Sequence, residues 1–220
     1  MIQENLQRIY RELPSGICLV AVSKFHPVEQ LMEAYHAGQR VFAENRPQEL
    51  AAKVPQMPTD VQWHFIGHLQ TNKLKLVLPY VSLVQSVDSL HLLEAIQAWA
   101  VSNNRLIDIL LELHLGAEET KHGFTEDEIL ELVGAADSRS AAPAGIRIRG
   151  LMGMATNTED VRVIEEDFIR IEKLFKRIQA MGLRDFDQLS IGMSGDWPLA
   201  VKHGATMVRI GTDIFGPREY

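Results

Sequence analysis

A lysine at the end of an apolar run is the residue in this sequence best placed for covalent chemistry. Lys24 follows residues 17–23, whose composition is typical of a buried parallel strand. Partial desolvation at the carboxyl end of such a strand favours the neutral amine, which can act as a base or as a nucleophile toward a carbonyl carbon. A lysine at this position could also extend its ammonium group into solvent. Position alone therefore leaves both interpretations open.

Two glycine-containing turns near the carboxyl terminus have the composition of a phosphate site. In residues 190–196, backbone N–H groups and the Ser194 hydroxyl precede a predicted helix and could bind an anion. In residues 208–213, Arg209 supplies positive charge and Gly211 allows the backbone to approach an anion closely. Each turn by itself could be only a helix cap or a tight turn. Their convergence predicts a phosphate site.

The histidines do not form a metal-binding pattern in the sequence. His64 and His68 are four residues apart, but Gly67 and a predicted strand end separate them, and no carboxylate or cysteine nearby completes a ligand set. We therefore do not expect zinc there. His114 and His122 flank a charged segment that we interpret as a solvated loop. No catalytic triad, Walker loop or dinucleotide glycine motif is present at a strand–helix junction.

Composition restricts the class of protein. The chain has 220 residues, 46% of them hydrophobic and 23% charged, which is typical of a soluble globular protein and fits one domain over residues 1–220. The net charge of −7 disfavours a broad surface for nucleic acid or anionic membrane but permits a local pocket for a small anion. A single cysteine, Cys18, and the absence of a secretory or membrane-spanning pattern predict a cytoplasmic location.

Strands and helices alternate along the sequence. Eight β-rich apolar runs are expected as strands, at residues 17–23, 40–44, 61–66, 83–87, 107–114, 146–152, 188–193 and 206–210. Helical periodicity is expected between them, at residues 28–37, 90–101, 126–136, 159–181 and 197–203, and in an additional amino-terminal helix at 2–13. The segment 138–145 is interpreted as a surface loop. This pattern predicts a (β/α)8 TIM barrel, whose functional groups lie at the carboxyl ends of the strands.

Four motifs in this order resemble the pyridoxal phosphate homeostasis protein family, also called the proline synthetase co-transcribed homologue family. They lie at residues 21–24, 42–46, 63–73 and 189–216, so the resemblance extends over nearly the whole chain. It implies a single barrel similar to the amino-terminal domain of alanine racemase. It also implies that pyridoxal 5′-phosphate is bound as an aldimine of Lys24.

The resemblance implies further site residues. The phosphate is expected at Ser194 and at backbone groups around Met193, Gly211 and Thr212. Arg209 is expected beside the cofactor, at either its ring nitrogen or its phosphate. Four more residues are expected around the ring, namely Asn45, His64, Gly67 and Met152.

The sequence favours a carrier of the cofactor over an enzyme. A racemase of the alanine type needs a second base, commonly a tyrosine, and none of the four tyrosines, Tyr10, Tyr35, Tyr80 and Tyr220, falls at the carboxyl end of a predicted strand. The family is regarded as maintaining vitamin B6 and amino-acid pools, which implies a monomeric carrier that could supply apo-enzymes. The alternatives are a weak pyridoxal phosphate-dependent amino-acid racemase and a barrel enzyme that acts on another phosphorylated metabolite.

Overall fold

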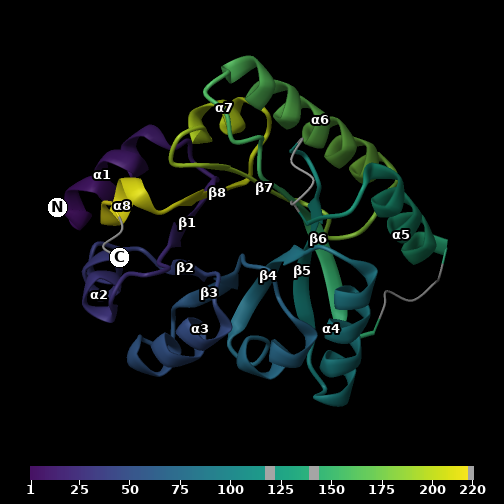
Figure 1. The fold of residues 1–220 in the computed structure, drawn as a ribbon, viewed down its shortest axis with the longest axis horizontal. Coiled ribbons are helices and arrows are strands. Elements are labelled where there is room, and N and C mark those ends of the chain that lie inside the picture. Colours follow the sequence, from purple (N-terminus) through teal and green to yellow (C-terminus); the bar gives the residue numbers. More distant parts are fainter. Residues whose placement is uncertain (117–121, 139–143, 218–220) are drawn as a thin grey trace.

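The chain folds into a closed barrel of parallel strands surrounded by helices (Figure 1). The computed structural model describes residues 1–116, 122–138 and 144–217. Within these residues the strands are neighbours in sequence order from β1 to β8, and β8 pairs with β1 to close the barrel, with Ala21 opposite Ile210. The (β/α)8 barrel predicted from the alternating pattern is therefore confirmed.

Each predicted strand is present, and no strand end differs from the prediction by more than two residues. The strands are β1 (Cys18–Val22), β2 (Val41–Glu44), β3 (Gln62–Phe65), β4 (Val81–Val87), β5 (Ile107–Leu113), β6 (Ile146–Gly153), β7 (Gln188–Met193) and β8 (Met207–Ile210). All of the pairings between them are parallel. Parallel pairing places all the carboxyl ends at one mouth of the barrel, which is where such barrels carry their functional groups.

The helices also agree with the sequence periodicity. They are α1 (Ile2–Glu12), α2 (Val28–His36), α3 (Pro47–Lys53), α4 (Leu90–Ser102), α5 (Glu126–Ser138), α6 (Val161–Ala180), α7 (Trp197–Lys202) and α8 (Thr212–Phe215). Two 3₁₀ segments, η1 (Val54–Gln56) and η2 (Thr71–Leu76), complete the elements. The short elements α3, η1, η2 and α8 are additions to the sequence prediction, because helices of so few residues show little periodicity.

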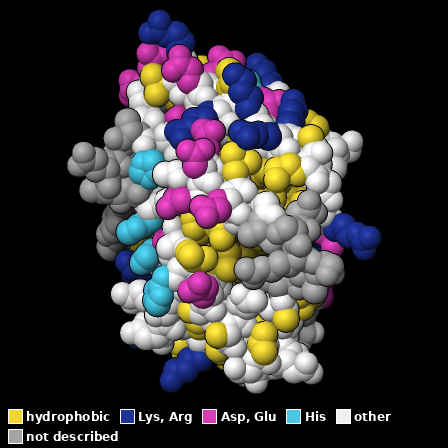
Figure 2. All heavy atoms as spheres, turned by 90° about the vertical axis from the view of Figure 1, so that its right-hand side faces the viewer, with side chains coloured by type: hydrophobic (Ala, Val, Ile, Leu, Met, Phe, Trp, Pro, Cys, Tyr) yellow, Lys and Arg dark blue, Asp and Glu magenta, His cyan; other side chains and the backbone are white. Residues whose placement is uncertain are grey.

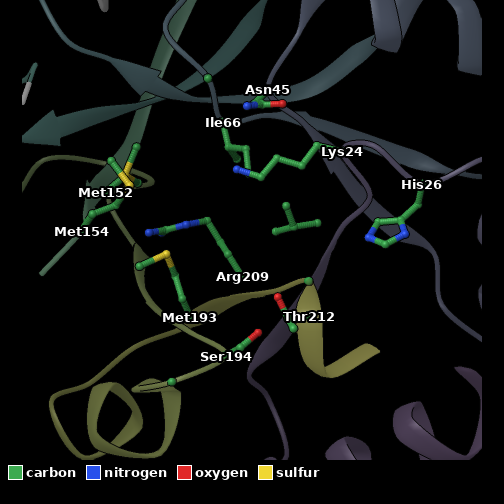
Figure 3. A pocket seen from close by; sticks show the side chains of 14 residues that line it. Lys24, His26, Asn45, Ile66, Met152, Met154, Met193, Ser194, Arg209 and Thr212 are labelled. Atoms are coloured by element: carbon green, nitrogen blue, oxygen red, sulfur yellow. The ribbon is translucent and has the colours of Figure 1, made fainter. Parts of the chain in front are cut away.

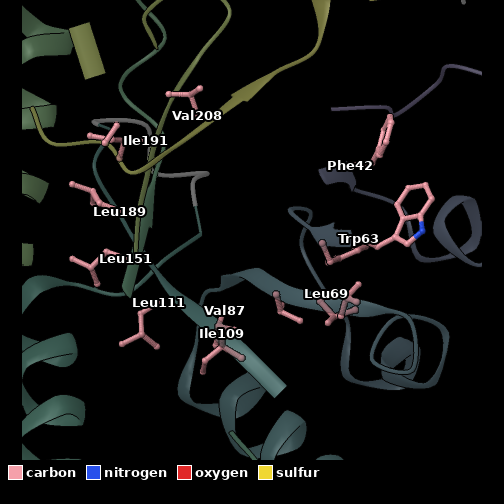
Figure 4. Close-up of a cluster of buried hydrophobic side chains, with 14 of the residues drawn as sticks. Phe42, Trp63, Leu69, Val87, Ile109, Leu111, Leu151, Leu189, Ile191 and Val208 are labelled. Atoms are coloured by element: carbon pink, nitrogen blue, oxygen red, sulfur yellow. The ribbon is translucent and has the colours of Figure 1, made fainter. Parts of the chain in front are cut away.

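Both faces of the barrel wall are buried, which explains why the sequences of the strands are continuous apolar runs. Outward-facing side chains such as Phe42, Trp63 and Val208 form the larger cluster between strands and helices (Figure 4). A smaller cluster, which includes Val20, Leu110 and Met207, lies on the other face of the strands. Because successive side chains alternate between faces, Arg209 shares the inner face with Met207, and Val208 does not.

The amino-terminal helix α1 takes a place in the outer ring of helices, beside α2 and α8 (Figure 1). Leu6 and Ile9 of α1 are fully buried, and Asn5 Nδ2 donates a hydrogen bond of 3.0 Å to the Ile214 carbonyl oxygen of α8. The helix therefore packs against α2 and α8 on the outside of the barrel.

Two predicted loops lie wholly or largely outside the described residues: the charged segment between His114 and His122, and the segment 138–145. Among the residues described, no helix has both the length and the apolar character that crossing a membrane requires.

Candidate functional site

A cavity of about 290 Å³ opens at the carboxyl ends of the strands. The residues that line it come from both ends of the chain, because closure of the barrel places β1 beside β8. Of the residues predicted for the site, the cavity is lined by Lys24, Asn45, Gly67, Met152, Met193, Ser194, Arg209, Gly211 and Thr212. Val22, His26, Ile66, Met154 and Gly195 complete the lining and were not among the predicted site residues.

The Lys24 side chain extends into this cavity and not past the strand end into solvent (Figure 3). Its nitrogen lies in the space near Asn45 and Ile66, while Ser194 and Thr212 occupy the opposite side of the cavity, with their hydroxyl oxygens toward the interior. An amine and a pair of hydroxyl groups thus lie on opposite sides of one cavity. This arrangement suits a ligand with an electrophilic carbon at one end and an anionic group at the other.

A buried ion cluster supports the backbone on both sides of Lys24. Lys53 Nζ donates to the Ser23 carbonyl oxygen at 2.8 Å, and it lies 2.7 Å from Oε1 of both Glu44 and Glu49. Glu49 Oε1 also accepts a hydrogen bond of 2.7 Å from the backbone N–H of Phe25. The residue before Lys24 and the residue after it are therefore tied to one charged group.

The ion cluster also explains an unusual backbone conformation. Phe25 has φ of +68°, which is rare for a residue with a bulky side chain. Its N–H bond to Glu49 and the Arg46 guanidinium, 4.6 Å from the centre of its ring, hold it in this conformation. The chain turns sharply after Lys24 as a result.

Glu44 is the most deeply buried member of the ion cluster. It is fully buried on β2, and its Oε1 accepts from the Ser23 hydroxyl at 2.6 Å. Desolvation raises the pKa of this carboxyl to about 7, although Lys53 and Ser23 favour the charged form. Burial thus opposes the charged form of Glu44, and the contacts with Lys53 and Ser23 stabilise it.

The turn that presents Ser194 is closed by hydrogen bonds in both directions. Met193 N–H donates to Asp196 Oδ1 at 2.5 Å, and Asp196 N–H donates to the Met193 carbonyl oxygen at 3.1 Å. Gly192 precedes the turn with φ of +91°, and a Cβ there would lie 2.6 Å from the Ala200 side chain. The position of Ser194 therefore depends on local backbone geometry that glycine makes possible.

Gly67 allows a close backbone approach at the cavity wall. A Cβ at Gly67 would lie 2.2 Å from the carbonyl oxygen of Asn45. No larger residue fits there unless the loop that follows β3 moves. Gly67 thus sets the position of Asn45, whose side chain also lines the cavity.

Arg209 is 4% exposed and is held by three hydrogen bonds. Its Nη1 donates to the Ser190 carbonyl oxygen at 2.8 Å and to Ser190 Oγ at 2.7 Å, and its Nη2 donates to the Gly153 carbonyl oxygen at 2.9 Å. Desolvation lowers the pKa of the guanidinium to about 10, while Glu112 and Asp196 oppose this effect. Arg209 remains positively charged at neutral pH.

His64, which the resemblance placed around the cofactor ring, does not line this cavity. It lies within β3, one layer deeper than the mouth, and its Nδ1 is 2.9 Å from Gln85 Nε2. Burial lowers the pKa of its imidazole to about 4, so the ring is neutral. Side chains alternate along a strand, and Ile66, two residues further on, takes the place at the mouth. His64 lines a separate cavity that also includes Cys18, Gln62 and Gln188.

A chain of hydrogen bonds nevertheless joins His64 to the site. Ser190 Oγ, the partner of Arg209, donates to Gln85 Oε1 at 2.7 Å, and Gln85 in turn contacts His64. The orientation of Arg209 thus depends on polar groups inside the barrel.

The ion cluster of Glu44, Glu49 and Lys53 was not predicted from the sequence. One signal was available, because Glu49 and Lys53 are four residues apart and can share a helix face. That spacing is common on exposed helices, and only the tertiary structure shows that Lys53 is buried.

The cavity also leaves hydrogen-bonding capacity for a ligand. Among the described residues, the buried Oδ1 of Asn45 has no hydrogen-bond partner. A buried amide oxygen without a partner is costly in a finished core. An amine, a guanidinium, two hydroxyls and this free amide fit a small aromatic aldehyde that carries a phosphate, and pyridoxal phosphate has these groups.

The barrel and the residues at its mouth define a domain of the alanine racemase amino-terminal type, and the family model "Alanine racemase, N-terminal domain" matches residues 1–219. Among curated relatives, a pyridoxal phosphate homeostasis protein of Vibrio alginolyticus is 35% identical over 100% of this chain and 98% of its own length. One from Schizosaccharomyces pombe is 39% identical over 92% of this chain and 85% of its own. The chain belongs to the pyridoxal phosphate homeostasis protein family.

Solved structures agree with this assignment. The PipY protein of Synechococcus elongatus, solved with pyridoxal phosphate bound, has a TM-score of 0.87 to this structure at 33% identity, and the match covers 98% of this chain and 100% of that one. Alanine racemase from E. faecalis has a TM-score of 0.76 at 20% identity, with 57% of its chain covered. The second likeness concerns the fold alone.

Proposed function

We propose that this protein binds pyridoxal 5′-phosphate covalently through Lys24 and holds it as a carrier that contributes to cofactor homeostasis. The observation that carries the proposal is the placement of Lys24 in one cavity with the hydroxyls of Ser194 and Thr212 opposite (Figure 3). The names of the relatives and the ligand of the PipY structure support it. When bound, the cofactor supplies an aldehyde that condenses with an amine, with loss of water.

Different residues of this chain would bind the phosphate and the ring of the cofactor. Ser194 and Thr212, with backbone N–H groups near Met193 and Gly211, would hold the phosphate by hydrogen bonds. The N–H of Met193 itself is bonded to Asp196 Oδ1 and is not one of these donors. Arg209 would face the ring nitrogen and not the phosphate, because its guanidinium is bonded toward Ser190 and Gly153. A permanently charged donor there disfavours protonation of a ring nitrogen, which weakens the ring as an acceptor of electrons.

The positions of the tyrosines, which are the candidates for a second base, support the carrier role. Tyr10 donates to Gln39 and Tyr35 donates to Asp60, and neither residue lines the cavity. Tyr80 is 44% exposed, and Tyr220 lies outside the described residues. The carrier hypothesis needs no second base. We further propose that the protein is a cytoplasmic monomer and that apo-enzymes which use pyridoxal phosphate receive the cofactor.

Borohydride trapping tests the binding proposal. The purified protein with cofactor should show an absorbance band near the visible edge that disappears on reduction, and mass spectrometry of the digest should locate the label on Lys24. The Lys24→Ala variant should lose the band, whereas Lys75→Ala, which removes an exposed lysine, should retain it. Labelling of another lysine in the parent protein would contradict the proposal.

Incubation with single enantiomers of amino acids separates the carrier from the racemase. The carrier hypothesis expects no sustained change of chirality. Turnover that persists over many cycles and is abolished by Lys24→Ala would establish the racemase instead. Sedimentation independent of concentration, at a mass of 24.8 kDa, would support the monomer.

A further inference from the structure

A second group of chemically capable side chains lies near the barrel mouth, outside the cavity described above. His68, Asp88 and His122 each offer one ligand atom, and these three atoms lie within 4.8 Å of one another. The three residues follow β3, β4 and β5 in the chain, so the sequence does not bring them together. Figure 2 shows histidine side chains (cyan) gathered along one edge of the molecule beside acidic side chains (magenta).

We propose that His68, Asp88 and His122 form a binding site for one divalent transition-metal ion of the zinc type. Two imidazole nitrogens and one carboxylate oxygen are ligands that Zn²⁺ prefers, and a site with three protein ligands leaves a fourth position open. The proposal is independent of pyridoxal phosphate. From the sequence we expected no zinc site at His64 and His68. In the structure His68 instead lies beside a carboxylate, Asp88, and a second imidazole, His122, which belong to other segments of the chain.

The backbone holds all three positions in place. The carbonyl oxygen of Gly67, directly before His68, accepts a hydrogen bond of 2.6 Å from Ser86 Oγ. Asp88 directly follows β4. Phe124, two residues after His122, pairs with β5 through its N–H to the Glu112 carbonyl oxygen at 2.8 Å and its carbonyl oxygen to the His114 N–H at 2.9 Å. The ligands are therefore brought together by the barrel framework.

The three side chains already lie in contact with one another. His68 Nδ1 is 2.7 Å from Asp88 Oδ2, and the His68 and His122 rings stack with centroids 4.4 Å apart and an interplanar angle of 20°. Tetrahedral Zn²⁺ with bonds of about 2.0–2.2 Å separates its ligand atoms by about 3.4 Å. Both histidines are exposed, so their rings can turn out of this stack and direct one nitrogen each toward a shared ion. The ion would replace the proton shared by His68 and Asp88, and this proton would pass to solvent.

The local charge favours a cation. The Asp88 side chain is 4% exposed, and it contacts His68 Nδ1 and the Ser89 hydroxyl. Glu112 lies close enough that the Asp88 charge contributes to raising its pKa. Among the residues that the structure describes, no lysine or arginine pairs with Asp88, and a buried carboxylate in that position gains from a bound cation.

Calorimetric titration with ZnCl₂ tests the site, using the full chain without an affinity tag and without added cofactor. We expect one ion per chain. His68→Gln and His122→Gln should each weaken binding at least tenfold, and the double variant should abolish it. His36→Gln and His91→Gln are matched controls, because both residues are exposed histidines outside the cluster, and they should bind as the parent does.

Cobalt supplies a readout that a change in folding alone would not produce. Co²⁺ added to the parent should give visible absorption bands of a low-coordinate site with nitrogen and oxygen ligands, and these bands should be absent from the double variant. In thermal melts without metal, His122→Gln should unfold as the parent does because His122 is exposed, whereas His68→Gln should unfold at a somewhat lower temperature because it also changes the contact with the buried Asp88. Unchanged binding in the double variant, loss of binding in the control variants, or no binding by the parent would overturn the proposal.

Discussion

The ammonium nitrogen of Lys53 lies 2.8 Å from the carbonyl oxygen of Ser23, the residue that directly precedes Lys24. Because Lys53 is 6% exposed and also pairs with Glu44 and Glu49, this contact joins α3 to the end of β1 through buried charge. The position of the proposed covalent lysine thus depends on a second lysine that does not enter the cavity.

Lys53→Met should destabilise the fold, because it keeps an apolar side chain but leaves Glu44 buried without its cation. Breaking a buried ion pair by removing one partner costs about 3–5 kcal/mol. Urea unfolding measures the loss. Lys176→Met is the matched control, since Lys176 forms an exposed pair with Glu172 four residues earlier, and such pairs contribute about 0.3–0.5 kcal/mol. Equal losses in the two variants would show that the ion cluster does not stabilise the fold.

Ser194→Ala and Thr212→Val should each weaken binding of pyridoxal phosphate without a large effect on stability. A hydrogen bond to a charged group contributes about 1.5–3 kcal/mol, so each variant should bind roughly ten- to a hundredfold more weakly. Fluorescence or absorbance titration measures the affinity. Ser102→Ala removes an exposed helical hydroxyl and should bind normally. Parent-like affinity in both cavity variants would place the phosphate elsewhere.

Gly67→Ala should disturb both the fold and the cavity, since the added Cβ would lie 2.2 Å from the Asn45 carbonyl oxygen. Overpacking of this kind costs about 1–3 kcal/mol. Gly134→Ala is a useful contrast, because it lies in α5 with nothing within 4 Å of the new Cβ. There, alanine should stabilise the helix by up to about 1 kcal/mol. Thermal unfolding of both variants distinguishes the two environments, and a Gly67→Ala protein as stable as the parent would show that the loop moves freely.

Glu112→Gln should change how stability depends on pH. Desolvation, followed by the charge of Asp88, raises the pKa of Glu112 from 4.5 to about 7. The folded state therefore binds this proton more tightly than the unfolded state, so the contribution of Glu112 to stability falls as pH rises from about 4.5 to 7. The shift corresponds to a free energy on the order of 3 kcal/mol.

The difference between Glu112→Gln and its parent isolates this contribution. His64, whose pKa is lowered to about 4, has the opposite sign and loses stability as pH falls below 6.5. Glu44 has the same sign as Glu112. Both groups are present in parent and variant, so the difference in their free energies of unfolding should favour the variant increasingly between pH 4.5 and 7. A difference that is flat with pH would show that Glu112 ionises as it does in the unfolded chain.

Much of the architecture was predictable because it depends on local pattern. The apolar run before Lys24 and the run that contains Arg209 are strands whose two faces are both buried, and such strands have the same composition wherever they occur in a barrel. Their alternation with helices implies parallel pairing, and parallel pairing places Lys24, Ser194 and Gly211 at the same mouth. These relationships need only sequence order and the period of each element.

The sequence by itself therefore determined the barrel and the mouth at which its functional residues lie. The depth of a side chain in the barrel was decided by the tertiary structure: His64 was predicted at the mouth but lies one layer below it, because strand twist and register set which residue reaches the cavity. Tertiary structure also decided the burial of Lys53 and the meeting of His68, Asp88 and His122. Such contacts join segments that are distant in the chain, so the local periodicity of the sequence does not predict them.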